Sequence, residues 1–436
     1  MSKNSLPLLI LLGLVLFVAA AFLMDTAGVF DTNQGQVRRV YFADNISSTH
    51  RDVIERFNQR YRGNIEVVPV NLPFTKFSTN ERKELLARSL RNKSDRIDIF
   101  AVDQIWVSRF SKWGDPMDHY LSDEERQNVL GYALESCFAD SVLVALPLYI
   151  DIGLMYYRRD ALRNLPDREQ VEARLRESMT WDEFVALRDR LRLKGEPYYL
   201  FQADDFEGLV CNYFELCAGQ DRRFFARNTV DLKSPVAGRA LQMLVDFVHR
   251  HGLSPPAVAE FDEIRSYQYL LDRKGVFVRG WPNFLEDYRE FYRDTIDVNQ
   301  FGRAALPHFA GQDPVSVFGG WNLMVSRNST QKEAAREFIR FLQTEEIQKF
   351  LFESGGYIPV SATVYADSAY MAAHPNLVYY RHLLDSGFHR PAMAEYTQIS
   401  DIISHFAHRA IKGEMTVQEA LARASSMIES NQVLIK

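Results

Sequence analysis

The chain has 436 residues, of which 47% are hydrophobic and 25% are charged, and its formal net charge is −6. This length favours two domains over one, and the composition is that of an ordinary globular protein. The acidic balance gives no reason to expect a nucleic acid or an anionic membrane surface as a partner. Aromatic residues make up 13%, which suits a large core and is also what a carbohydrate site requires.

Residues 6–24 form an uncharged run rich in Leu, Val, Ala and Phe, and Lys3 is the one charge before it. The run is long enough to cross a membrane as a helix, and its positive flank stays inside, so the rest of the chain is expected outside the cytoplasm. A signal peptide cleaved near residues 19–21 and an uncleaved anchor both fit, and the apolar run past these alanines favours the anchor. We therefore expect a signal peptide or membrane anchor over 1–25 and a linker over 26–36.

Strands and helices alternate after this linker. Three runs rich in β-branched and aromatic residues predict strands: 37–43, 65–70 and 97–102. Two amphipathic runs between them predict helices: 48–61, capped by Ser48 and Thr49, and 80–91. Such alternation is typical of a parallel, doubly wound sheet with helices on both faces. Ligands bind beyond the carboxyl ends of the strands in such a sheet, which makes Asp44, Asn45 and Asp103 candidates.

Residues 142–157 read VLVALPLYIDIGLMYY. A proline in an extended run excludes a central strand position, so we expect the chain to cross between two lobes here. Further crossings are expected at 304–307 and near Pro359. Three crossings make each lobe discontinuous, as in hinged two-lobe proteins. The predicted lobes are 37–147 with 307–360, and 148–306 with 361–436.

Several ordered segments carry a family resemblance. They are FGGWNLMV from Phe318, GGYIPV from Gly355, DIFAVDQIWVSRFSKWG from Asp98, ALPLYIDIGLMYYRRDAL from Ala145, MTWDEFVALRDRLR from Met179, LLDRKGVFVRGWPNF from Leu270 and GEMTVQEALARASSMI from Gly413. Together they resemble the extracellular solute-binding proteins of ABC importers, in particular the maltose-binding-protein-like family of sugar-binding proteins. Within MTWDEF, Thr180 and Glu183 form a capping-box pattern at a helix start.

The resemblance implies an α/β, type II periplasmic-binding-protein fold: two hinged lobes, each built on a doubly wound sheet. It further implies an extracytoplasmic, monomeric protein that binds a mono- or oligosaccharide between closing lobes and delivers it to the transmembrane subunits of an ABC permease. No enzyme activity, cofactor or metal is expected. The chain has no GxxxxGK[ST] loop, so the ATPase and the membrane channel are expected to be separate chains.

A sugar presents C–H faces to aromatic rings and hydroxyl edges to charged or amide side chains. The residues and the resemblance together give these candidates for ligand binding: Asn45, Asp103, Tyr149, Asp151, Glu207, Trp281, Trp321, Tyr357 and Arg390. Trp281, between Gly280 and Pro282, is the leading stacking candidate because a tryptophan in an irregular loop is seldom plain core.

Each candidate also has a structural alternative. Asn45 fits a turn, Asp103 a helix N-cap, and Asp151 a hydrogen bond that orients the hinge. Asp204 or Asp205 could replace Glu207. Trp106, Trp113 and Trp181 are expected to pack within the lobes.

Other chemistries have weaker support. No carboxylate pair stands out as that of a glycosidase, and the ten histidines show no metal-binding spacing. The tyrosine pairs at 156–157 and 379–380 resemble those of ferric-ion-binding proteins, but the first pair suits strand packing. A polyamine, a sugar phosphate and a role as a sensing subunit remain alternatives. Cys211 and Cys217, six residues apart on a predicted helix, cannot bridge without distortion, so buried free thiols are expected.

Overall fold

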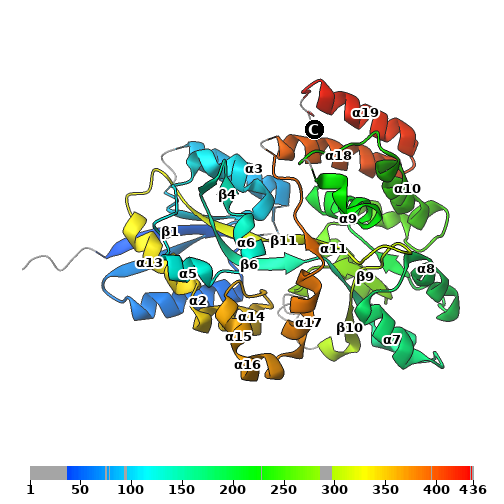
Figure 1. The fold of residues 1–436 in the computed structure, drawn as a ribbon, viewed down its shortest axis with the longest axis horizontal. Coiled ribbons are helices and arrows are strands. Elements are labelled where there is room, and N and C mark those ends of the chain that lie inside the picture. Colours follow the sequence, from blue (N-terminus) through cyan, green and yellow to red (C-terminus); the bar gives the residue numbers. More distant parts are fainter. Residues whose placement is uncertain are drawn as a thin grey trace, which may run out of the picture.

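The computed structural model describes residues 37–73, 76–77, 79–92, 96–226, 228–284, 297–393, 395–432 and 434. The predicted membrane segment and linker, residues 1–36, lie outside the described residues. Within the described ranges, no helix is both long and apolar enough to cross a membrane. The chain forms two lobes that lie side by side along its longest axis (Figure 1).

A mixed sheet forms the centre of the first lobe, in the order β12-β11-β3-β1-β2, with β6 also paired to β11. Its strands are β1 Arg38–Asp44, β2 Ile65–Asn71, β3 Ile99–Asp103, β6 Leu146–Ile152, β11 Ser316–Val325 and β12 Gly387–Phe388. The predicted strands β1, β2 and β3 are parallel, as expected, whereas β11 runs antiparallel to β3 and β6. Pro147 lies in β6, outside the parallel core of the sheet.

Helices of four to thirteen residues surround this sheet. They are α2 Ser48–Arg60, α3 Thr79–Arg91, α4 Val107–Phe110, α5 Asp123–Gln127, α6 Gly131–Glu135, α13 Lys332–Leu342 and α14 Glu345–Gly355. Helix α2 buries Val53, Ile54 and Phe57 on one face, as its periodicity predicts. Its N-cap is Ser47, whose side chain accepts the backbone N–H of His50, so the prediction of Ser48 and Thr49 as caps was one residue late. A short hairpin, β4 Phe138–Ala139 and β5 Val142–Leu143, precedes β6.

The second lobe has a smaller, largely antiparallel sheet in the order β10-β7-β9-β8. Its strands are β7 Leu154–Arg158, β8 Tyr199–Leu200, β9 Phe277–Gly280 and β10 Phe301–Ala304. Its helices are α7 Arg168–Glu177, α8 Trp181–Arg190, α9 Glu207–Gln220, α10 Pro235–His249, α11 Glu263–Asp272, α17 Pro375–Leu384, α18 Tyr396–Ile411 and α19 Val417–Glu429. Helix α9 is buried on all sides, and the predicted capping box of Thr180 and Glu183 starts α8.

Shorter elements complete the chain. Helices α15 Ala362–Ala366 and α16 Ser368–Ala373 precede α17. The 3-10 helices are η1 Gln104–Trp106, η2 Ser111–Trp113, η3 Arg159–Leu162, η4 Arg222–Phe225, η5 Pro256–Glu260 and η6 Val298–Gln300. The cysteines Cys137, Cys211 and Cys217 are buried free thiols in the described structure, as predicted.

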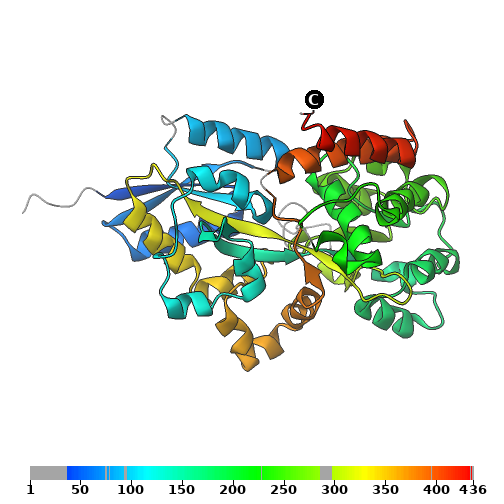
Figure 2. The same ribbon diagram turned by 45° about the horizontal axis from the view of Figure 1, so that its top comes forward.

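Two hydrophobic cores meet along β6 and β11. Tyr149 and Trp321 belong to the core of the first lobe, whereas Ile150 and Phe318 belong to the core of the second. The two strands therefore run from one lobe into the other, and Figure 2 shows them crossing the middle of the molecule. Side chains on these strands lie where the lobes meet, so the pair positions the candidate site.

Candidate ligand-binding site

The candidate residues lie on, or directly beside, the helices and strands that meet at this junction. Asn45 follows β1, Asp103 ends β3, Tyr149 and Asp151 lie on β6, Glu207 begins α9, Trp281 follows β9, Trp321 lies on β11, Tyr357 follows α14 and Arg390 follows β12. The strand register places Trp321 opposite both Asp103 and Tyr149. Except for Asn45, Asp103 and Trp281, which are partly buried, the candidates are buried.

Arg390 joins an acidic residue of each lobe. Its Nη1 donates to Oε1 of Glu207 at 2.7 Å, and its Nη2 donates to Oδ1 of Asp103 at 2.9 Å. The Tyr396 hydroxyl also donates to Glu207, at 2.6 Å. Burial raises the pKa of Glu207, and Arg390 opposes this rise. Asp103 also accepts the backbone N–H of Ile105, so the N-cap alternative and the charged contact are both present.

Trp281 and Trp321 each stack on an arginine that is fixed by a carboxylate. The guanidinium carbon of Arg279 lies 3.9 Å from the Trp281 ring centre, and its Nη2 donates to Oε1 of Glu215 at 2.8 Å. On the other side of the junction, the Arg82 guanidinium carbon lies 4.4 Å from the Trp321 ring centre. Cation–π contacts of buried groups are worth about 2 kcal/mol, so each arginine fixes one indole face.

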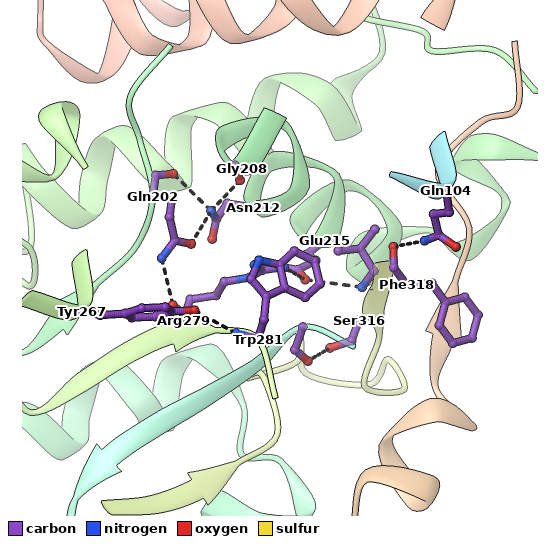
Figure 3. Close-up of polar contacts among 12 residues, drawn as sticks. Gln104, Gln202, Gly208, Asn212, Glu215, Tyr267, Arg279, Trp281, Ser316 and Phe318 are labelled. Carbon is purple, nitrogen blue, oxygen red and sulfur yellow. Dashed lines mark hydrogen bonds and ion pairs between the residues drawn. The ribbon is translucent and has the colours of Figure 1, made fainter. Parts of the chain in front are cut away.

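The Arg279–Trp281 stack is held by hydrogen bonds from several elements (Figure 3). Nε2 of Gln202 donates to the Arg279 carbonyl at 2.9 Å, and Nδ2 of Asn212 donates to the Gln202 carbonyl at 3.1 Å. The Trp281 backbone N–H donates to the Tyr267 hydroxyl at 3.0 Å. These hydrogen bonds fix the backbone at the end of β9, so the segment that carries Trp281 is held rigidly.

Two glycines let Trp281 and β6 approach β11. A Cβ atom on Gly319 would lie 2.7 Å from Cζ3 of Trp281. Gly320 has φ of +125°, and its Cβ would lie 2.5 Å from the Tyr149 carbonyl oxygen, so a side chain there would be both strained and blocked. The double glycine before Trp321 therefore has a packing reason.

Asp151 is the exception among the acidic residues of the junction. It is 7% exposed, and its Oδ1 has no hydrogen-bond partner in the part of the chain that the structure describes. Burial raises the pKa of Asp151 to about 7; the nearby Asp103 adds to the rise and Arg279 opposes it. The hinge-orienting hydrogen bond considered for Asp151 is thus not made by Oδ1 within the described residues.

Aromatic side chains of the first lobe form a second cluster. The Tyr149 and Tyr357 ring centres are 4.5 Å apart, and the His50 and Tyr357 ring centres are 5.1 Å apart. The Tyr357 hydroxyl and the Ser47 hydroxyl are within hydrogen-bond distance, at 3.2 Å. Burial lowers the pKa of His50, so its imidazole is neutral at pH 7. Asn45 lies beside this cluster, and its carbonyl accepts the Ser47 N–H in a turn.

Three polar residues of the junction were not among the predicted site residues: Arg82, Glu215 and Arg279. The Nη2 atom of Arg82 donates to Oδ1 of Asp44 at 3.2 Å, and both side chains are buried. Glu215 follows Glu207 by eight residues on α9, a spacing that places the two on similar faces of a helix. That spacing was a sequence signal for Glu215, and the position at the end of a strand was the signal for Asp44. Arg82, inside an amphipathic helix, gave none.

The lobes also touch through α3 and α18, which lie next to each other in Figure 2. The Lys83 ammonium lies 3.6 Å from Oδ2 of Asp401, and Nδ2 of Asn80 donates to Oδ1 of Asp401 at 3.2 Å. Burial lowers the pKa of Lys83. In the described part of the chain, no group of three or more His, Cys, Asp and Glu side chains could hold a metal ion.

Two lobes joined by crossing strands, with aromatic and charged side chains converging at their junction, define the architecture of a solute-binding protein. The chain belongs to the bacterial extracellular solute-binding protein family, whose model matches residues 43–349.

Known proteins with similar sequences and structures agree with this assignment. A Deinococcus radiodurans protein named as a probable ABC transporter-binding protein is 24% identical over 82% of this chain and 84% of its own length. The maltose-bound MalE3 structure of T. maritima superposes with a TM-score of 0.79 at 25% identity, over 90% of this chain and 100% of that one. A Thermotoga lettingae solute-binding protein bound with α-D-tagatose has a TM-score of 0.77 at 20% identity, over 91% and 99%.

The protein is therefore the extracytoplasmic solute-binding component of an ABC transporter, with a solute and a permease as its partners. The two-lobe α/β fold predicted from the sequence is confirmed. The family consists of binding proteins and not of enzymes.

Proposed function

We propose that the solute is a carbohydrate, bound where the two lobes meet. The observation that carries this proposal is the pair of carboxylate–arginine–tryptophan stacks, one from each side of the junction: Asp44–Arg82–Trp321 and Glu215–Arg279–Trp281. A tryptophan ring is held rigidly when one of its faces packs against a fixed arginine. Such a ring is suited to stacking on the C–H face of a sugar with little loss of side-chain entropy.

Buried polar atoms without partners support a hydroxyl-rich ligand. Within the described residues, the donors Nε of Arg390, Nη1 of Arg279 and Nε1 of Trp106 have no hydrogen-bond partner, nor does the acceptor Oδ1 of Asp151. Each such buried group costs about 1–3 kcal/mol when left unpaired. A hydroxyl both donates and accepts, so a polyol could satisfy donors and acceptor together. A phosphate oxygen that carries no proton could serve only the donors.

The arginines of the junction also argue against an anionic ligand. Arg82, Arg279 and Arg390 each have a carboxylate partner at 3.2 Å or less. A phosphate would have to compete with these buried pairs. These three arginines thus orient rings and carboxylates, and none of the three is left to bind an anion alone.

We take the present arrangement to be the closed form of a hinged protein. Arg390 and the α3–α18 contact tie the lobes together, and opening would separate these groups. A ligand that touches both lobes only in the closed form shifts the equilibrium toward it by its differential affinity. The permease would then recognise the closed form.

The remaining parts of the proposal rest on sequence. Residues 1–25 would hold a monomeric binding protein at the outer face of the membrane, and the lobe boundaries would fall at 147/148, 306/307 and 360/361.

A thermal-shift screen of the full chain tests the carbohydrate assignment. The panel contains mono- and oligosaccharides, polyamines, amino acids, sugar phosphates and ferric ion. Only compounds that bind the folded form raise the melting temperature. We expect a saccharide to do so, with the shift lost in Trp281→Ala and kept in the matched control Trp113→Ala, whose ring packs on Phe110. Stabilisation by a polyamine, an amino acid, a phosphate or iron without any by a saccharide would refute the assignment.

A further inference from the structure

We propose that the carbohydrate carries an amino group, and that its ammonium binds Asp151. This inference rests on the proposed function and narrows it to amine-bearing saccharides. It follows from the charge balance of the junction and from one buried carboxylate oxygen that has no hydrogen-bond partner among the described residues.

Among the residues that the structure describes, the junction holds more carboxylates than cations. Five carboxylates lie there: Asp44, Asp103, Asp151, Glu207 and Glu215. They face the guanidinium groups of three arginines: Arg82, Arg279 and Arg390. When all are ionised, five negative charges against three positive ones leave an excess of two. The Lys83–Asp401 pair beside them is neutral in sum, so it does not correct the balance.

The excess is not shared evenly. Arg82 pairs with Asp44, Arg279 with Glu215, and Arg390 with both Asp103 and Glu207. These ion pairs involve all three arginines, and none of the ion pairs formed within the described residues includes Asp151.

Asp151 lies between the two lobes and next to the stacking ring. Its charge interacts with Asp103 of β3, Arg279 of β9 and Tyr149 of its own strand. Its Cβ lies 3.2 Å from the position that a Gly319 Cβ would take, and the Trp281 ring lies 2.7 Å from that same position. A ligand ring against Trp281 would therefore have a substituent within reach of Asp151.

The free-energy cost of burying the Asp151 carboxylate without a cation indicates which chemical group the substituent carries. A buried ionised carboxylate without a cation is strongly disfavoured. A hydroxyl would donate one hydrogen bond but leave the negative charge uncompensated. An ammonium would provide both a donor and the missing positive charge.

A saccharide is still needed for the other groups. The unpaired donors Nε of Arg390 and Nη1 of Arg279 require acceptors, which a fully protonated polyamine lacks. An amine-bearing saccharide supplies hydroxyl oxygens to these donors, an ammonium to Asp151 and a C–H face to Trp281. Glu263, to which the Trp281 side chain donates a hydrogen bond, lies on the same side, and burial raises its pKa to about 7.

Titration calorimetry with three matched probes tests this inference. The probes are a glucosamine disaccharide, its N-acetylated form and the corresponding glucose disaccharide, each added to the full chain at pH 7. The amine form is expected to bind at least tenfold more tightly than the other two. Asp151→Asn should abolish this preference, whereas Asp385→Asn, which alters an exposed pair with Arg381, should keep it.

The outcomes separate this inference from the proposal beneath it. Equal or tighter binding of a neutral probe, or a preference that survives in Asp151→Asn, overturns the amine assignment and leaves the carbohydrate function intact. Failure of all three probes, while neutral saccharides stabilise the protein in the thermal screen, also overturns it. If no saccharide of any kind stabilises the protein, the carbohydrate function fails and the amine assignment fails with it.

Discussion

Replacing Arg390 with methionine should destabilise the protein severely. The arginine is buried and donates to Glu207 at 2.7 Å and to Asp103 at 2.9 Å. Methionine fills a similar volume but leaves two carboxylates without their cation. Breaking a buried ion pair by removing one partner costs about 3–5 kcal/mol, so we expect the free energy of unfolding at pH 7.5 to fall by about that much.

Urea unfolding of the full chain, followed by circular dichroism, measures this change. The control is Arg423→Met, which removes an exposed pair with Glu419 of similar length, 2.6 Å. Exposed pairs contribute about 0.2–1 kcal/mol, so the control should stay within about 1 kcal/mol of the wild type.

A second variant identifies the cause. The double variant Arg390→Met/Glu207→Gln lacks one of the two carboxylate charges that Arg390→Met leaves without a cation. We expect it to recover part of the lost free energy of unfolding. Because burial raises the pKa of Glu207, the single variant should also recover stability as the pH is lowered toward 5. An Arg390→Met protein within about 1 kcal/mol of the wild type would refute the view that this cluster is a buried ionic link between the lobes.

Three further perturbations probe the same junction. Gly319→Ala places a methyl group 2.7 Å from Trp281 and should weaken ligand binding more than tenfold in calorimetry. The control Gly131→Ala, with open space around the new methyl group, should not weaken it. Equal affinities of the two variants would contradict the close approach of Trp281 to Gly319. The pKa of Asp151 is about 7 in the folded chain against 3.8 for the free group, so the folded state holds the extra proton between these values and its stability falls as the pH rises through them. Asp151→Asn should therefore gain up to about 4 kcal/mol relative to the wild type between pH 4 and pH 8 in urea unfolding, and a pH-independent difference would contradict it. Lys83→Met removes the α3–α18 ion pair and should weaken apparent ligand affinity about three- to tenfold by favouring the open form; unchanged affinity would show that this contact does not govern closure.

Local sequence patterns predicted the first lobe well. Strands β1, β2 and β3 were placed within two residues of their observed bounds, because alternation and β-branched composition act over a few neighbouring residues. The rule that ligands bind beyond the ends of parallel strands drew attention to Asp44, Asn45 and Asp103, and the structure places them at or directly after the ends of β1 and β3.

The second lobe was less predictable. Its sheet joins β7, β9 and β10 antiparallel across more than a hundred residues, and no local pattern encodes such pairing. Family resemblance supplied the architecture there instead.

The site shows the same division between local and non-local information. Trp281 and Trp321 stood out because glycines flank them, and the structure explains one of those glycines by a close ring contact. Arg82 did not stand out, because an arginine in an amphipathic helix is usually solvated. Its burial against Asp44 and Trp321 depends on contacts that form only in the folded chain.

The partners of Arg279 and Arg390 also depend on the folded structure. An arginine near a binding site can indicate an anionic or highly hydroxylated ligand, or it can pair with a structural carboxylate. The structure pairs both with carboxylates. Charge in a sequence therefore says little about ligand charge until its partners are known.

The measurement that tests the central claim most directly is the distance between the lobes with and without solute. Spin labels on Glu55→Cys in α2 and Arg239→Cys in α10, both exposed positions, report it by pulsed electron resonance, and the native cysteines are buried. We predict that the saccharide with the largest thermal shift narrows the distance distribution to a single closed population. Tight binding of that saccharide with an unchanged distribution would contradict the claim that the lobes close on it.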